Sequence, residues 1–205
     1  MADPTTSTGV APTTTIAPHY QATMSNVTEE RLAHSYTSDC PVRPNEVVLV
    51  TLTHWGFDGE THVGEIVVAR EEGDHVVEIF HRLFAIGYPI ESVIPIGDLP
   101  PGIEDTDPSY NNTSGLHCRF VAGTNHWSEH ARGLAIDINP FLNPYKTDTA
   151  IWPEESGRYL DRTLGEPGMI VDGDDVVGAF DDAGWRWGGH WASSVDYQHF
   201  SVTGR

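Results

Sequence analysis

The chain has 205 residues, which is enough for one domain with a sizeable core and a short additional segment. Its 30 acidic residues against 11 basic ones give a net charge of −19. This charge argues against binding to DNA, RNA or an anionic membrane surface, because proteins bind phosphate groups through Lys and Arg. No stretch is long and apolar enough to cross a membrane.

Threonine and proline dominate the start of the chain. Such a sequence buries too little apolar surface to offset the entropy lost on ordering. We therefore predict a flexible Thr/Pro-rich tail or linker over residues 1–38, with a possible short helix at Glu29–Ser35, and one folded domain over residues 39–205. Residues 1–4 lack the basic start and apolar run of a signal peptide, so export would depend on a leader already removed or on another route.

Hydrophobic patterns predict a strand-rich first half of the domain. A β-branched run predicts a buried strand, and apolar residues at helical spacing predict a helix that Gly87 and Pro89 end. The predicted elements are strands at Val47–Thr53, Val63–Val68 and Ile90–Ile96, a turn at Gly56–Gly59, and a helix at about 70–86.

The second half is richer in loops. Residues 97–115 form a long predicted loop, which we expect to be a wall of a substrate cleft. Asp174 is a suitable N-cap for a helix that Gly184 ends. The remaining predictions are strands at Leu116–Phe120, Gly133–Ile138, Trp185–Trp187 and Asp196–Val202, and a loop with one helical turn at Ile151–Gly168. The order predicts an α+β fold, a small and mostly antiparallel sheet with helices on one side.

Two cysteines, Cys40 and Cys118, stand far apart in the sequence and form no C-x-x-C pair, which disfavours a cysteine zinc site. In an exported protein two cysteines most simply form a disulfide with each other. The alternative is a pair of buried thiols. A disulfide would tie the entry of the domain to the segment before the residues described next.

Two stretches carry the residue types of a metal site. His130 and Asp137 are seven residues apart with Gly133 between them, and Asp196 and His199 lie near the end of the chain. On one helix the first pair would be too far apart to share an ion, but a loop that turns at Gly133 into a strand can bring them together. These residues supply three ligands and a spare carboxylate, as a zinc hydrolase requires.

The same residues resemble a known family. The chain contains Ser128-x-His130-x-x-Gly133-x-Ala135-x-Asp137, then Trp187-Gly188-Gly189-x-Trp191 and Asp196-x-x-His199-Phe200. This pattern is similar to that of the D-alanyl-D-alanine carboxypeptidase-like zinc peptidases, which include cell-wall carboxypeptidases and L-alanyl-D-glutamate endopeptidases and share the hedgehog/DD-peptidase fold. The resemblance extends over about residues 40–203.

The resemblance implies a role for each residue. It implies zinc on His130, Asp137 and His199, Asp196 as the general base, and Arg119 as the group that stabilises the oxyanion or binds a substrate carboxylate. Ser128 would help to position the substrate, and Asp rather than Glu at the base position favours L,D-type cleavage.

We therefore expect a monomeric, extracellular or cell-wall-associated zinc peptidase that hydrolyses peptidoglycan stem peptides. It would act as an L-alanyl-D-glutamate-type endopeptidase or as an L,D- or D,D-carboxypeptidase. The alternative is a non-catalytic, zinc-stabilised wall-binding module of the same fold.

A competing motif overlaps the first stretch. His126, Glu129 and His130 also spell H-x-x-E-H, in which two histidines on one helix face bind zinc and Glu129 acts as the base. Gly123 and Gly133 on either side of the motif disfavour a helix there, so we expect His126 to lie in a loop.

Overall fold

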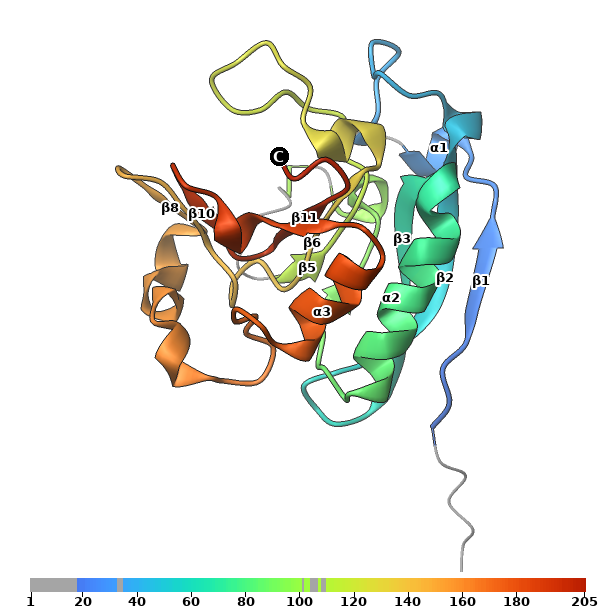
Figure 1. Cartoon of the computed structure of the whole chain (residues 1–205). Helices are drawn as coiled ribbons and strands as arrows, with labels where there is room; N and C mark the ends of the chain where they lie inside the picture. The colour runs from blue at the N-terminus through green and yellow to red at the C-terminus, as the bar shows by residue number, and fades with distance from the viewer. Residues whose placement is uncertain (1–17, 33–34, 101, 104–106, 108–109) are drawn as a thin grey trace, which may run out of the picture.

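The computed structural model describes residues 18–32, 35–100, 102–103, 107 and 110–205. It confirms the α+β fold, but the strands of this part form several small sheets instead of one (Figure 1). Three sheets have three strands each and are antiparallel, and a fourth is a two-stranded parallel pair.

The largest sheet is built on a long hairpin. Strands β2 (Val47–Trp55) and β3 (Thr61–Ala69) pair along their whole length, from Val47 opposite Ala69 to Trp55 opposite Thr61. Both predicted strands and the turn between them are confirmed. A third strand, β1 (Ala22–Ser25), pairs with β2 at the edge of the sheet.

Strand β1 corrects part of the predicted tail. Residues 22–25 form backbone hydrogen bonds with β2, and the short helix α1 (Glu29–Leu32) buries Leu32 to 1% exposure. The sequence between Thr23 and Leu32 is polar, so its pattern did not reveal a strand whose main contribution is backbone pairing. Residues 1–17 lie outside the described part, and the flexible tail stays a prediction there.

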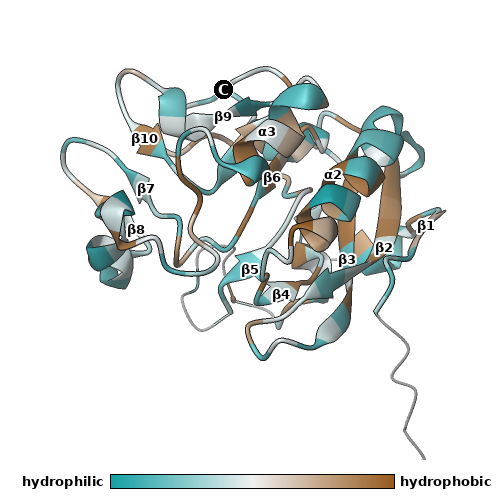
Figure 2. Cartoon of the chain, turned by 60° about the horizontal axis from the view of Figure 1, so that its bottom comes forward, coloured by the Kyte–Doolittle hydropathy of each residue, from teal (hydrophilic) through white to brown (hydrophobic). Residues whose placement is uncertain are grey.

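Two helices cover one face of the strands and enclose the main core (Figure 1). Helix α2 (Gly73–Ala85) follows a 3-10 turn, η3 (Arg70–Glu72), and its buried face packs on β2. Helix α3 (Asp175–Asp182) begins where Asp174 accepts a hydrogen bond from the Val177 amide at 2.8 Å, as predicted. Figure 2 shows the apolar side of α2 turned toward β2 and β3. The buried residues of α2 are Gly73, Val76, Ile79, Phe80 and Leu83.

The opposite face of β2 and β3 is also covered. Val47, Leu49 and Val67 form a second buried cluster with Leu32 of α1 and with Leu116. Since the first half of β2 has apolar neighbours on both faces, residues 47–50 are continuously apolar and do not alternate.

The remaining sheets lie in the C-terminal half. Strand β11 (His199–Ser201) is the middle strand between β6 (Ala135–Asp137) and β9 (Arg186–Trp187). A second sheet places β7 (Tyr145–Lys146) between β10 (Val195–Asp196) and β8 (Ile151–Trp152). Phe180 of α3 stacks on Phe200 of β11 at 3.8 Å and joins the sheet of β6, β11 and β9 to the main core.

Several predicted elements differ from the structure. The strand predicted at Ile90–Ile96 is only β4 (Ser92–Val93), which pairs in parallel with β5 (Asn112–Thr113) and is followed by η4 (Ile96–Asp98). No strand forms at Leu116–Phe120, because the Leu116 side chain fills the second core cluster and its amide bonds singly to Val67 O. The predicted loop at 151–168 contains β8 and two 3-10 helices, η6 (Glu154–Leu160) and η7 (Arg162–Leu164).

The predicted strand Asp196–Val202 is divided in two. Asp196 ends β10, whereas His199 begins β11, and the two strands belong to different sheets. The chain therefore changes direction between Asp196 and His199. Because the two residues are not on one strand, the alternation of side chains along a strand does not force them onto opposite faces.

A disulfide joins Cys40 to Cys118, with 5.7 Å between their Cα atoms. This confirms the predicted pair and excludes the alternative of two free thiols. In the part of the chain that the structure describes, no helix has both the length and the apolar character that a membrane span requires.

Candidate metal centre

His130 lies on η5 (Glu129–Arg132), a short 3-10 helix with well-defined ends. At its start the Ser128 hydroxyl accepts a hydrogen bond from the His130 amide at 3.3 Å. At its end Gly133 has φ +68°, and a Cβ there would lie 2.4 Å from Ala69 N. Only glycine fits this turn, which leads into β6 and so toward Asp137. The predicted loop that turns at Gly133 is confirmed.

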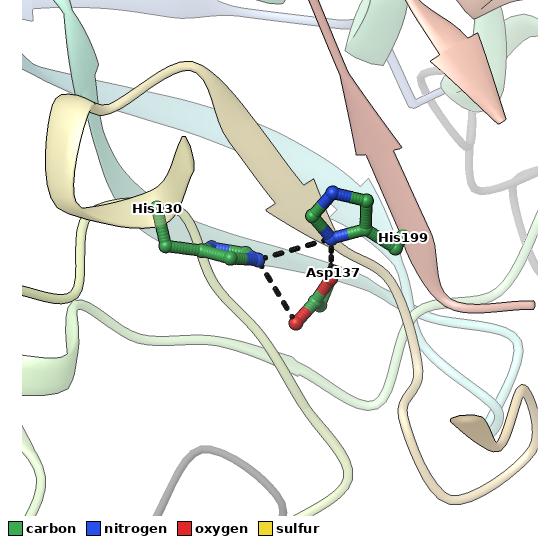
Figure 3. A group of neighbouring side chains, drawn as sticks. All are labelled: His130, Asp137 and His199. Carbon is green, nitrogen blue, oxygen red and sulfur yellow. Dashed lines mark hydrogen bonds and ion pairs between the residues drawn. The ribbon is translucent and has the colours of Figure 1, made fainter. Parts of the chain in front are cut away.

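Asp137 and His199 are brought together by strand pairing. They stand opposite each other in the antiparallel pair of β6 and β11. His199 Nδ1 lies 2.9 Å from Asp137 Oδ1, and His130 Nε2 lies 3.2 Å both from Asp137 Oδ2 and from His199 Nδ1 (Figure 3). One ligand atom from each residue lies within 4.8 Å of the others, so the group has the size of a metal site.

The outer nitrogen of each imidazole is held by a main-chain oxygen. His130 Nδ1 lies 2.7 Å from Gly115 O, and His199 Nε2 lies 2.9 Å from Arg205 O. A main-chain oxygen accepts and does not donate, so each outer nitrogen carries a proton and donates it.

When both imidazoles are neutral, the inner atoms of the group are therefore all acceptors. His130 Nε2 and His199 Nδ1 turn lone pairs toward each other and toward the Asp137 carboxylate. Three acceptors at these distances repel one another unless a proton or a metal cation lies between them. The residues fit a metal ion with nitrogen and oxygen ligands, and carbonyls on the outer nitrogens are a common feature of histidines that bind metals.

The group is almost completely buried. His130 is 2% exposed and both Asp137 and His199 are 6% exposed. Burial by itself would raise the pKa of the Asp137 carboxyl, but in the metal-free protein the positive charge of protonated His130 and His199 and the hydrogen bonds they donate outweigh this effect and hold that pKa below its usual range. Asp137 is thus kept in the charged form that a metal ion requires.

Asp196 lies beside this group. Gly188 separates the two, since a Cβ on Gly188 would meet Asp196 Cβ at 2.9 Å and His199 Cβ at 3.3 Å. The carboxyl atom Asp196 Oδ1 is buried and has no hydrogen-bond partner within the described residues. The pKa of Asp196 is raised to about 7, mainly by burial and also by the charge of Asp137, whereas His199 and Arg119 act in the opposite direction. A carboxyl group with this pKa can accept and return a proton near neutral pH.

Arg119 stands at the base of a hairpin that leads to His130. Its carbonyl accepts a hydrogen bond from the Ser128 amide at 3.1 Å, and the next pair in the hairpin, Phe120 and Trp127, stack on each other with ring centroids 4.0 Å apart. The disulfide at Cys118 holds the neighbouring residue. The positive charge of Arg119 acts to lower the pKa of the Asp196 carboxyl.

The other predicted residues are placed as follows. Ser128 is 6% exposed and its hydroxyl caps η5, so the contact it makes is structural; a contact with substrate stays a prediction. His126 is exposed on the hairpin and is separate from the group of His130. Residues 126–130 do not form the α-helix that the H-x-x-E-H alternative requires, and this excludes that motif as a zinc site.

The structure also has a cavity of about 550 Å³ away from the metal centre. Among the described residues of the predicted cleft wall, residues 97–115, Asn111 alone lines it. Residues 101, 104–106 and 108–109 of that wall lie outside the described part, so the cleft stays a prediction. The cavity is lined by Phe57, Glu91, Asn111, Phe141, Leu142, Tyr159, Glu166 and Pro167.

Sequence reasoning did not find the residues that orient the histidines. Gly115 and Arg205 act through main-chain oxygens, which carry no signature in the sequence. Ser201 donates a hydrogen bond to Arg205 O at 2.9 Å. Ser201 follows His199 by two residues on one strand, so the sequence did indicate that its side chain lies on the same face as His199.

Residues 122–202 match a family model described as D-alanyl-D-alanine carboxypeptidase. The matched segment contains all three residues of the metal group together with Asp196, whereas Arg119 lies just before it. Over residues 122–202, this match confirms the resemblance that the sequence pattern indicated. Searches among curated proteins and among solved structures found no match.

Proposed function

Because residues 122–202 match the D-alanyl-D-alanine carboxypeptidase family, we propose that this chain is a zinc peptidase that hydrolyses peptidoglycan stem peptides. The observation that carries the proposal is the convergence of three buried acceptor groups, His130, Asp137 and His199, beside the carboxyl group of Asp196. Two nitrogen ligands and one oxygen ligand suit Zn²⁺ and leave a fourth position open for catalysis.

A zinc ion held by these residues would polarise the scissile carbonyl and make a water molecule acidic enough to attack near pH 7. Asp196 is the general base in this proposal: its carboxylate accepts a proton from the attacking water. It then returns that proton to the leaving amine as the C–N bond breaks. Arg119 stabilises the negative charge that develops on the carbonyl oxygen, or binds a substrate carboxylate.

Two further features agree with an exported hydrolase. The Cys40–Cys118 disulfide is typical of proteins that work outside the reducing cytosol. The net charge of −19 disfavours nucleic acid as a partner and so leaves a peptide as the proposed substrate. We propose an extracellular or cell-wall location and a monomer for the chain.

The decisive experiment is a mass-spectrometric assay with defined muropeptides and zinc-loaded protein. Release of L-alanine-linked fragments would identify an endopeptidase, and loss of a terminal D-alanine would identify a carboxypeptidase. Asp at position 196 favours the first product. Stoichiometric zinc without any product would overturn the catalytic proposal in favour of a zinc-stabilised wall-binding module, and protein that binds no zinc would overturn both.

A further inference from the structure

The end of the described chain folds back onto His199. Arg205 O accepts the hydrogen bond from His199 Nε2 at 2.9 Å, on the side of the ring that faces away from Asp137. In the neutral ring, the proton on Nε2 leaves the lone pair on Nδ1, which is the nitrogen that lies 2.9 Å from Asp137 Oδ1. The position of one main-chain oxygen therefore decides which nitrogen of His199 can bind a metal ion.

Ser201 holds that oxygen in place. It is completely buried and lies two residues after His199 on β11, so both side chains are on the same face of the strand. The Ser201 hydroxyl donates to Arg205 O at 2.9 Å and accepts from the Arg205 amide at 3.0 Å. One side chain thus satisfies both main-chain polar groups of residue 205.

Trp191 holds the preceding residue. Its indole N–H donates to Gly204 O at 3.0 Å, and its ring lies 5.3 Å from the His199 ring. Gly204 has φ +77°, which lets the chain turn back toward β11 at little cost. Residues 203–205 lie beyond the segment that matches the family model.

We propose that Ser201 is a positioning residue for the metal centre, which acts through the main chain of Arg205 to select the Nε2–H tautomer of His199. This inference rests on the proposed function, since it assigns His199 Nδ1 as a zinc ligand. With Arg205 O displaced, a proton on Nδ1 would be stabilised by Asp137, and that tautomer has no lone pair for the metal ion.

The test compares zinc affinity in four proteins by competition with a chromogenic chelator. These are the wild type, Ser201→Ala, the chain ended after Thr203, and the combination of both changes. Loss of an outer partner of a ligand histidine weakens metal binding about 10–100-fold. We expect a loss in that range for each single change and no further loss in the combination, because both changes remove the same contact.

Two variants serve as controls. Ser156→Ala removes another fully buried serine hydroxyl that donates to a carbonyl, that of Pro153, and Arg205→Ala removes a side chain but keeps the main-chain oxygen. Both should keep wild-type affinity. Wild-type affinity in Ser201→Ala, or losses that add in the combined variant, would overturn the proposal.

A second measurement separates this inference from the proposed function. In the metal-free protein, ¹⁵N NMR of His199 should show Nε2 protonated in the wild type and a mixture of tautomers, or the Nδ1–H form, in Ser201→Ala. An unchanged tautomer would contradict the role of Ser201 whether or not the protein binds zinc. Absence of zinc binding in the wild type would instead contradict the proposed function.

Discussion

His199 stands directly opposite Asp137 in the antiparallel pair of β11 and β6, with His199 Nδ1 2.9 Å from Asp137 Oδ1. A slip of one residue in this register would turn His199 toward the other face of the strand, where Phe200 now packs on Phe180. The packing of the core and the assembly of the metal group therefore depend on the same register. The predictions that follow test the chemistry that this arrangement supports.

His130→Ala should lose stoichiometric zinc, because only Asp137 and His199 would remain to hold the ion. Elemental analysis after dialysis against a limited zinc supply measures this loss. His126→Ala is the matched control: His126 is exposed on the neighbouring hairpin, and its removal should leave zinc content unchanged. Equal zinc in both variants would exclude His130 as a ligand.

Asp196→Asn should keep zinc but lose turnover, since the amide cannot accept the proton of the attacking water. General base catalysis contributes about 10²–10⁴-fold, so we expect kcat on the preferred muropeptide to fall within that range. Asp148→Asn, an exposed aspartate in the turn between β7 and β8, should behave as the wild type. Retained turnover in Asp196→Asn would remove Asp196 as the base.

The metal-free protein should lose stability as the pH rises from about 4 to about 7. The folded-state pKa of Asp196 is raised to about 7 from an ordinary value of 3.8, so in this window the folded state holds a proton that the unfolded state has released. Above pH 7 the Asp196 carboxyl is ionised in both the folded and the unfolded state, so it no longer changes the unfolding free energy with pH.

This contribution is measured as a difference between two proteins. Asparagine does not titrate, so the unfolding free energy of metal-free Asp196→Asn minus that of the metal-free wild type should increase between pH 4 and 7 and then become constant. Urea unfolding at a series of pH values gives both terms. A difference that does not depend on pH would show that Asp196 keeps its ordinary pKa.

Arg119→Met should lower kcat about 10²–10³-fold, the loss that follows removal of one donor to a developing oxyanion. Zinc content should not change, because Arg119 is not part of the metal group. Arg132→Met changes an exposed arginine at the end of η5 and is the control for loss of positive charge nearby. If KM rises while kcat is constant, Arg119 binds the substrate and does not stabilise the transition state.

The variant with both Cys40→Ala and Cys118→Ala should be less stable by about 2–4 kcal/mol, the usual contribution of a disulfide that closes a long loop. Guanidinium unfolding measures the difference. A reducing agent should lower the midpoint of the wild type and leave the variant unaffected. Since Cys118 precedes Arg119, we also expect lower kcat in the variant; unchanged stability would mean that the disulfide is dispensable for the fold.

The amino-acid sequence by itself determined the elements whose signals are local. The β-branched run of β2, the helical spacing of α2 and the cap at Asp174 all depend on residues close in the chain, and each was predicted correctly. The resemblance also brought together His130, Asp137 and His199 as a group, because their residue types and spacing form a recognisable pattern.

Only the tertiary structure decided how these parts meet. Strand β1 was hidden in a polar segment because its contribution is backbone pairing, and Asp196 and His199 proved to lie in different sheets. The tautomers of both histidines depend on the main-chain oxygens of Gly115 and Arg205, which every residue carries and which only folding places within 2.7 Å and 2.9 Å of an imidazole nitrogen. The sequence gives the chemistry of each side chain directly. The register of distant strands and the partners of main-chain hydrogen bonds depend on how the whole chain packs, so they cannot be predicted from local sequence.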